Sequence, residues 1–139
     1  GPGGTGRTMM RLLVVDASVV IDLLARFDPA PLEALLFAPE TVLAAPELLD
    51  IEVLQVFRRL ERTGAFQDPD ATLLDDFRAL PIERYAHLPL TTRIWDRRAN
   101  LTAYDATYVA LAEALGAPLA TRDRRLAAAP LDDVQVLVP

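Results

Sequence analysis

The sequence predicts an α/β fold in which a central, mostly parallel, twisted sheet is flanked by helices on both faces. Short apolar runs alternate with segments of helical periodicity along almost the whole chain, and this alternation is typical of parallel sheets with crossover helices. Apolar residues make up 52% of the 139 residues and charged residues 24%, which is typical of a compact domain. At this length we expect one domain with a single core.

The domain is expected to span residues 10–139. Residues 1–9 look like an expression-vector remnant ahead of a natural start at Met10. The apolar run after Arg11 is interrupted by Asp16 and Asp22, so it does not match a signal peptide, and no run approaches membrane-spanning length. Cysteine is absent, which excludes disulfides and thiol chemistry. We therefore expect a cytoplasmic protein with no membrane segment.

The first half of the chain is predicted to form two strands and three helices. The segment Asp28-Pro-Ala-Pro breaks the first helix, and Gly64 stops the third, which begins at Pro46 because proline suits the first helical position. In chain order, we expect a strand over 12–15, a helix over 18–26, a short helix through 36, a strand over 41–45 and the helix from Pro46.

The second half repeats the alternation. Thr102 is typical of a residue that opens a helix and Gly116 of one that ends it. The expected elements are helices over 69–79, 90–99 and 103–115, and strands over 82–85, 118–121 and 134–138.

Four carboxylates fall where such a sheet gathers functional groups. Asp16 follows the first strand, Asp105 lies in the first turn of its helix, and Asp123 comes two residues after a late strand. In open α/β sheets the active crevice lies outside the carboxyl ends of the strands. Glu52 can reach the same place from its helix, so we expect all four acids in one pocket.

Each acid also has a structural explanation that the sequence leaves open. Asp16 could cap the following helix, Asp105 could complete a capping box with Thr102, and Asp123 could be a turn aspartate. Glu52, among apolar neighbours, could be paired with an arginine such as Arg59. These four explanations are independent of one another, whereas a single metal site accounts for all four acids.

The charges in such a pocket favour a divalent cation. Two carboxylates about 4 Å apart repel by roughly 4 kcal/mol near a protein surface, so four could not all stay ionised without a counter-ion. Hard oxygen ligands favour Mg²⁺ or Mn²⁺. The chain has no lysine and one histidine, His87, which we expect at the surface. A metal-bound hydroxide is therefore the expected nucleophile.

The net charge of −6 argues against nucleic-acid binding unless positive charge is local. All fourteen basic residues are arginine, and most fall in clusters; arginine binds phosphate in a bidentate way. Candidates for contact with an RNA backbone are Arg97, Arg98, Arg122 and Arg124. Trp95 and Tyr104 could stack on unpaired bases or could belong to the core.

The residues that carry these patterns resemble the PIN domains, and within them the VapC-like toxins of toxin–antitoxin pairs. The marks of the resemblance are Val-Val-Asp16-Ala-Ser18, Pro46-Glu-Leu-Leu-Asp-Ile-Glu52, Leu101-Thr-Ala-Tyr104-Asp105-Ala-Thr-Tyr108 and Leu119-Ala-Thr121-Arg-Asp123. The likeness covers almost the whole chain from Met10, and Gln55, where many relatives have asparagine, is a mild departure.

This resemblance implies a PIN-like three-layer fold and a Mg²⁺- or Mn²⁺-dependent endoribonuclease that acts as a toxin. Such proteins are usually homodimers held inactive by a small cognate antitoxin protein. By the same likeness Asp16, Glu52, Asp105 and Asp123 take the acidic catalytic and metal positions. We expect Asp16 and Asp105 to hold the cation directly. Ser18 and Thr121 take supporting polar positions.

Three other classes compete with this interpretation. A receiver domain should carry a lysine near its last strands, and a haloacid-dehalogenase-type phosphatase should carry Asp-x-Asp after the first strand, where this chain has Asp16-Ala-Ser18. A non-catalytic PIN-like module that binds RNA or protein remains the main alternative. Loss of one or more acids would be its mark, and all four are present.

Overall fold

The computed structural model describes residues 9–131 and 133–139. The predicted vector remnant at residues 1–9 therefore lies, apart from Met9, outside the described residues. The described part contains a five-stranded sheet in which every neighbouring pair of strands is parallel. The predicted sheet is confirmed.

Strands and helices alternate as the sequence predicts. The strands are β1 (Arg11–Val15), β2 (Thr41–Pro46), β3 (Ile82–Tyr85), β4 (Leu119–Ala120) and β5 (Val136–Leu137). The helices are α1 (Ala17–Leu24), α2 (Pro29–Leu36), α3 (Leu48–Arg62), α4 (Leu73–Ala79), α5 (Thr91–Asp96), α6 (Ala103–Leu115) and α7 (Arg124–Ala127), with a 3₁₀ turn, η2 (Leu88–Leu90), before α5.

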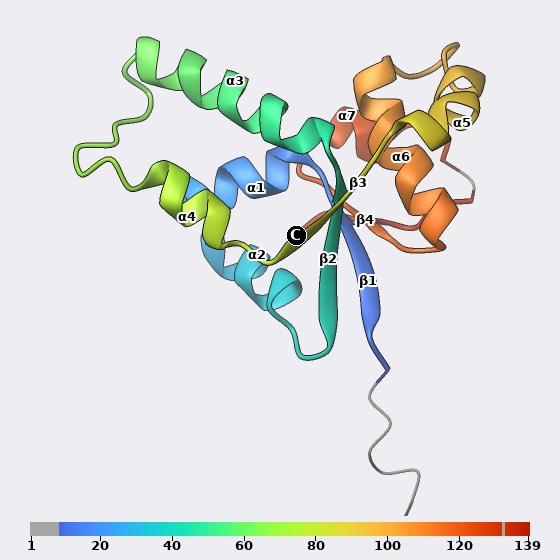
Figure 1. The fold of residues 1–139 in the computed structure, drawn as a ribbon, viewed down its shortest axis with the longest axis horizontal. Coiled ribbons are helices and arrows are strands. Elements are labelled where there is room, and N and C mark those ends of the chain that lie inside the picture. The colour runs from blue at the N-terminus through green and yellow to red at the C-terminus, as the bar shows by residue number, and fades with distance from the viewer. Residues whose placement is uncertain (1–8, 132) are drawn as a thin grey trace, which may run out of the picture.

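The elements form three layers. Figure 1 shows α1 to α4 on one side of the sheet and α5 and α6 on the other. Within each layer α1 packs against α3, and α5 packs against α6, which also covers β1 and β2. β1 and β2 end in fully buried apolar runs because both of their faces are covered. No helix of the described residues is long and apolar enough to cross a membrane.

The strand order, β3-β2-β1-β4-β5, places β1 in the middle of the sheet. From β1 the chain builds outward through β2 and β3 on one side, then returns to build β4 and β5 on the other. The order therefore reverses between β1 and β4. In doubly wound sheets this switch point, at the carboxyl ends of the strands, is where the crossover helices part and a crevice opens.

Several predicted boundaries are wrong. Pro46 does not begin the long helix: it is the last residue of β2, opposite Tyr85, and the Glu47 N–H continues the ladder by donating to the Tyr85 carbonyl at 2.9 Å. The helix predicted over 69–79 begins only at Leu73, because the Asp68 carboxylate accepts the backbone N–H groups of Thr72 and Leu73 and holds the preceding residues in a turn.

A third wrong boundary is the helix predicted over 90–99, which ends at Asp96. In addition, α7 was not predicted, because its four residues are too few for a periodic apolar pattern.

Candidate active site

Asp16 lies at the switch point, directly after β1. It is only 5% exposed, and its N–H donates to the Ala120 carbonyl at 3.2 Å, which continues the pairing of β1 with β4. Its Oδ1 accepts the backbone N–H of Val19 at 3.2 Å and so caps α1. The predicted cap is therefore present, and it holds this carboxylate in one orientation.

Two hydroxyls complete the surroundings of Asp16. Ser18 Oγ donates to Oδ1 at 2.6 Å, and Thr121 Oγ1 donates to Oδ2. Ser18 Oγ in turn accepts the Arg122 N–H at 2.9 Å, and Thr121 Oγ1 accepts the Asp123 N–H at 2.9 Å. The start of α1 and the loop after β4 are thus joined through one network, and Ser18 and Thr121 orient Asp16.

Asp123 follows Thr121 and caps α7. Its Oδ1 accepts the backbone N–H groups of Arg125 at 2.9 Å and Leu126 at 3.4 Å. The Arg125 side chain approaches to 3.9 Å, yet it is 95% exposed and so neutralises the carboxylate weakly. Among the described residues, Oδ2 of Asp123 receives no hydrogen bond, so this oxygen is available to a ligand.

Asp105 reaches the site from the first turn of α6. Thr102 caps this helix by accepting the Asp105 N–H at 3.1 Å, which is the first half of the predicted capping box. The half-buried carboxylate of Asp105 lines a hollow of about 280 Å³ between α6 and α7, together with Arg125.

Glu52 comes from the middle of α3 and is half-buried. Tyr108, three residues after Asp105 on α6, donates its hydroxyl to Glu52 Oε1 at 2.5 Å. The alternative in which Arg59 pairs with Glu52 finds no support, because no ion pair joins them within 9–131 and 133–139. The partner of Glu52 is a neutral phenol, which leaves its negative charge uncompensated.

Tyr108 is the functional candidate that the sequence patterns did not single out. Its phenol is almost completely buried, and burial followed by the bond to Glu52 raises the pKa of Tyr108 above its ordinary value of 10.0. Asp16 and Asp105 raise this pKa further, so three acids act on one hydroxyl. The spacing of Tyr108 could have identified it, because residues three apart share a helix face and Tyr108 therefore lies beside Asp105.

The carboxylates repel one another in a chain. Burial is the main cause that raises the pKa of Asp16 to about 6, and repulsion by Asp123 makes a smaller contribution to the same rise. Burial and then Asp123 raise the pKa of Asp105, and burial raises the pKa of Glu52, with a contribution from Asp105. Asp123 therefore acts on both Asp16 and Asp105, and Asp105 acts on Glu52, so each acid interacts with at least one other.

Carboxylate oxygens are ligands that suit a hard divalent cation, but the described side chains alone do not complete its coordination. No three Asp, Glu, His or Cys side chains within residues 9–131 and 133–139 converge closely enough to form a complete metal site. Mg²⁺ commonly binds through one or two carboxylates and keeps several waters, so a few converging acids suffice. The free Oδ2 of Asp123 and the charged, oriented Asp16 meet that need.

Two of the predicted RNA contacts are occupied within the chain. Arg97 binds Glu113 at 2.6 Å and Asp133 at 3.1 Å, with 17% of its side chain exposed. Arg122, 11% exposed, donates to Asp22 at 3.2 Å and to backbone carbonyls that include those of Phe27 and Asp28. Arg97 and Arg122 are thus engaged by carboxylates of the chain itself, which leaves their guanidinium groups poorly placed to bind RNA.

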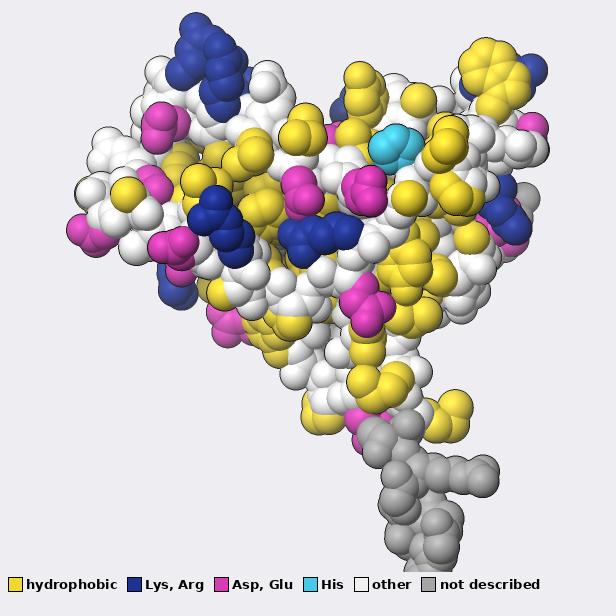
Figure 2. Space-filling view, in the orientation of Figure 1, with side chains coloured by type: hydrophobic (Ala, Val, Ile, Leu, Met, Phe, Trp, Pro, Cys, Tyr) yellow, Lys and Arg dark blue, Asp and Glu magenta, His cyan; other side chains and the backbone are white. Residues whose placement is uncertain are grey.

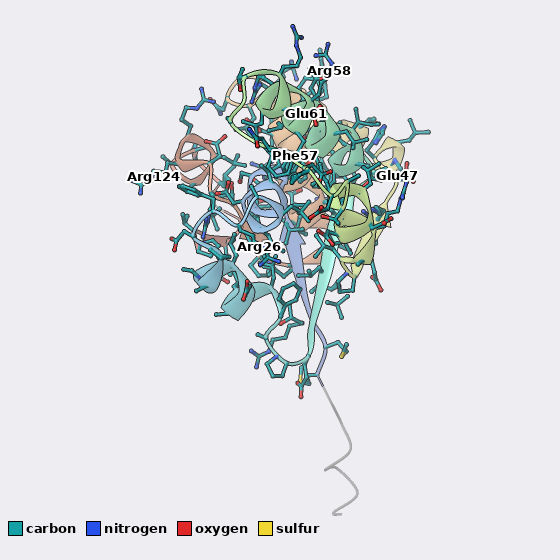
Figure 3. All side chains as sticks on the ribbon, turned by 90° about the vertical axis from the view of Figure 1, so that its left-hand side faces the viewer. Arg26, Glu47, Phe57, Arg58, Glu61 and Arg124 are labelled. Atoms are coloured by element: carbon teal, nitrogen blue, oxygen red, sulfur yellow. The ribbon has the colours of Figure 1, made fainter. Side chains whose placement is uncertain are left out.

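The other predicted contacts face solvent. Arg98 lies over the ring of Trp95, 4.5 Å from its centroid, and both are exposed. Arg124 is exposed on α7 and points outward in Figure 3. Trp95 and Tyr104 are 66% and 62% exposed, so neither is a core residue. His87 lies at the surface as predicted (cyan in Figure 2).

Tyr104 borders a shallow apolar groove beside the acids. The groove has a volume of about 450 Å³ and contains Glu52 at one edge. Its other residues are Ala17, Leu48, Ile51, Gln55 and Val56. Ile51 and Leu54 on α3 are exposed, so the expectation that apolar neighbours enclose Glu52 is wrong: one side of α3 is open.

A parallel sheet with helices on both faces and a buried aspartate, Asp16, at its switch point defines the class of protein as a three-layer α/β domain, and comparison with known proteins gives the family. The sequence model of the PIN domain matches residues 13–131. The chain belongs to the PIN domain family.

Within the family, the similar proteins are VapC ribonucleases. Ribonuclease VapC1 of Mycobacterium tuberculosis is 43% identical over 119 residues, which cover 84% of this chain and 90% of that protein. Ribonuclease VapC9 of the same organism is 44% identical over 118 residues, which cover 83% and 88%. This chain is therefore a VapC-like member of the family.

Solved structures share the fold. PAE2754 from Pyrobaculum aerophilum superposes with a TM-score of 0.68 at 24% identity and covers 96% of this chain and 88% of its own. VapBC2 from Rickettsia felis, bound to a DNA fragment from its promoter, gives a TM-score of 0.68 at 12% identity, with 91% and 98% covered. At these identities the likeness supports the three-layer architecture alone.

Proposed function

We propose that this protein is an endoribonuclease whose phosphodiester hydrolysis depends on Mg²⁺ or Mn²⁺ bound by Asp16, Glu52, Asp105 and Asp123. The observation that carries the proposal is that these four acids influence one another's pKa in pairs, while no buried guanidinium among the described residues is paired with any of them. The names of the similar proteins support the reaction class.

The residues of the chain have distinct parts in this reaction. When bound, the cation would activate a water molecule and stabilise the charge that develops on phosphate. Ser18 and Thr121 fix both oxygens of Asp16 in place. Tyr108 holds Glu52 by donating to one oxygen and leaves the other free to accept a proton or orient water.

We also propose the biological setting that the family likeness implies: a toxin of the cytoplasm that acts as a homodimer and is inhibited by a small cognate antitoxin. The exposed apolar side of α3, with Ile51 and Leu54, supports a protein contact, because a monomer gains nothing by leaving both residues in water. RNA is the proposed substrate.

Cleavage assays test the enzyme. The intact protein should cut RNA in the presence of Mg²⁺ or Mn²⁺ and lose this activity in EDTA. Asp16→Asn and Asp105→Asn, which keep the side-chain shape, should each lose at least about a hundredfold in rate. Asp75→Asn, an exposed acid on α4, serves as the control and should retain full activity.

Equal cleavage by the Asp16 and Asp105 variants would mean that a contaminating nuclease is responsible. A non-catalytic binding module, the main alternative, would bind RNA without cutting it under any of these conditions.

A further inference from the structure

The C-terminal end of α3 carries three exposed arginines: Arg58, Arg59 and Arg62. Figure 2 shows them as the dark-blue group over that end of the helix, and in Figure 3 Arg58 points away from the body of the molecule. Together with Gln55 and Thr63 they line a hollow of about 390 Å³. We call these three residues the α3 arginines.

The α3 arginines have no intramolecular counter-charge. No ion pair among residues 9–131 and 133–139 includes any of them, whereas Arg84, Arg93 and Arg97 are each neutralised by a carboxylate. Glu61 lies three residues after Arg58, a spacing at which side chains are neighbours on a helix, yet the described residues show no ion pair between them. A protein of net charge −6 thus concentrates free positive charge at one place.

These charges have opposing effects on folding, because Arg59 and Arg62, in the last turn of α3, interact favourably with the helix dipole. Like charges at helical spacing destabilise a helix, and the three lie within about one and a half turns. The buried face of α3 is supplied by other residues, namely Leu49, Val53 and Phe57. The arrangement is therefore explained better by an anionic ligand than by packing.

Two of the α3 arginines, Arg59 and Arg62, lie on the same side of α3 as Glu52. At about 100° per residue, Arg59 lies within about 20° of Glu52 around the helix, and Gln55 and Arg62 follow on the same side. Gln55 borders both the apolar groove beside Glu52 and the hollow of the α3 arginines, so the two depressions adjoin. At about 1.5 Å per residue, Arg59 and Arg62 lie about 10 and 15 Å from Glu52 along the axis.

We infer that an RNA strand leaves the acidic site along this face of α3 and that the α3 arginines bind its phosphates. The inference rests on the proposed ribonuclease function and adds the location of the substrate backbone. At about 3.4 Å per stacked nucleotide, the arginines meet phosphates roughly three to four nucleotides from the cleaved bond. Tyr104, exposed across the apolar groove from Gln55, stacks on a base between the two positions.

Binding measurements with matched variants test the inference. The first variant is Arg58→Gln/Arg59→Gln/Arg62→Gln; glutamine has a helix propensity close to that of arginine, so α3 should stay folded. The control is Arg11→Gln/Arg26→Gln/Arg78→Gln, which removes three exposed arginines elsewhere and gives the same net charge. The probe is a fluorescent single-stranded RNA with a 2′-O-methyl backbone, measured by anisotropy between 50 and 300 mM salt.

We expect the α3 variant to bind the probe about 10- to 100-fold more weakly at 0.1 M salt and to lose about two units of the slope of log K against log salt. The control should bind within about threefold of the intact protein. Lengthening the probe past the cleavage site should strengthen binding of the intact protein and of the control, but not that of the α3 variant.

Equal binding by the α3 and control variants would overturn the inference, including the case in which the α3 arginines hold an acidic protein instead. That failure differs from failure of the proposed function, which would appear as an intact protein that binds but does not cut RNA with Mg²⁺ or Mn²⁺.

Discussion

At the scale of single residues, Asp16 combines a structural and a chemical role. It caps α1 and ties β1 to the loop after β4, yet its burial makes the ionised form costly. Functional sites often retain such groups at a cost in stability. The cost depends on pH, so it can be measured.

Asp16→Asn should be more stable than the intact protein at pH 7 without divalent cations. The folded-state pKa of about 6 lies above the ordinary 3.8, so between these values the folded state holds a proton that the unfolded state releases, and stability falls as the pH rises. At pH 7 the raised pKa lowers the free energy of unfolding of the intact protein by about 3 kcal/mol. Asp16→Asn removes this loss, but its weaker bonds to Ser18 and Thr121 leave a net gain in the free energy of unfolding of about 1 to 3 kcal/mol.

Urea unfolding from pH 3.5 to 7.5, in EDTA, would measure this effect. If the free energy of unfolding of Asp16→Asn still declined between pH 4 and 6, a group other than Asp16 would be responsible for the decline. Asp75→Asn, at an exposed position, should follow the curve of the intact protein.

Tyr108→Phe should impair Glu52 without removing it. The Tyr108 hydroxyl lowers the pKa of Glu52, so its loss raises that pKa and shifts the acid limb of the cleavage profile to higher pH. The free energy of unfolding should fall by about 1 to 2 kcal/mol at neutral pH.

Cleavage profiles from pH 5 to 9 would show the shift. Tyr85→Phe removes a phenol on β3 whose hydroxyl donates to Glu83, and serves as the control. A uniform loss of rate with an unshifted profile would show that Tyr108 acts only in packing.

At the scale of elements, Arg122 links segments that the site needs together. Its side chain binds Asp22 and the carbonyls of the loop between α1 and α2, while its N–H binds Ser18. In that loop Arg26 and Asp28 adopt left-handed backbone conformations, with φ of 57° and 43°, which cost energy for residues other than glycine. Arg122 offsets this strain by donating hydrogen bonds to the backbone carbonyls of Phe27 and Asp28.

Arg122→Lys should destabilise the protein by about 2 to 4 kcal/mol, because lysine keeps the charge but cannot form the same fork of hydrogen bonds. The effect should appear in thermal unfolding and as faster hydrogen exchange at the start of α1. Arg124→Lys, at an exposed neighbour, is the control and should change stability by less than about 0.5 kcal/mol. Equal stability of both variants would contradict the clamp.

The elements also show where sequence patterns succeed and fail. Thr102 and Gly116 correctly mark the two ends of α6, since a cap and a left-handed glycine at φ 61° are local features. Pro46 was placed on the wrong side of a boundary because its partner, Tyr85, is 39 residues away and pairing decided the outcome. Local chemistry is readable from the chain, whereas cross-strand pairing is not.

The same distinction applies to the site. The four acids are predicted from their places after strands and within helices, and the structure shows pairwise interactions among them, whereas their action as one site stays a prediction. The candidate arginines are predicted from arginine clusters in the sequence, yet Arg97 and Arg122 are paired within the chain. Partners such as Glu113 and Asp22 cannot be found without the tertiary packing.

At the scale of the whole molecule, the fold separates charge of opposite sign. The acids gather where the strand order reverses, while the α3 arginines lie at the far end of a helix that leaves the same place. A polyanion is repelled from the acidic region until a cation neutralises it, and it is attracted by the arginines throughout. RNA binding and cation binding should therefore be mutually reinforcing.

Divalent cations should stabilise the whole domain in a pH-dependent way. A ligand that binds only the folded state, present at about 100 times its dissociation constant, adds about 2.7 kcal/mol to the free energy of unfolding, which for a domain of this size raises the melting temperature by about 8 to 15 °C.

Because burial raises the pKa of Asp16 to about 6, protons compete with the cation for this carboxylate below that pH, and the apparent affinity for the cation should weaken about tenfold per pH unit. Thermal unfolding with Mn²⁺ should show a rise at pH 5 that is about half of the rise at pH 7.5, because a tenfold weaker affinity leaves about 1.4 kcal/mol of stabilisation, with NaCl of equal ionic strength as the control. Asp16→Asn should lose most of the rise at pH 7.5. If NaCl reproduces the effect, or if Mn²⁺ stabilises equally at both values, the acids are not acting as a cation site and repulsion among them is screened by salt alone.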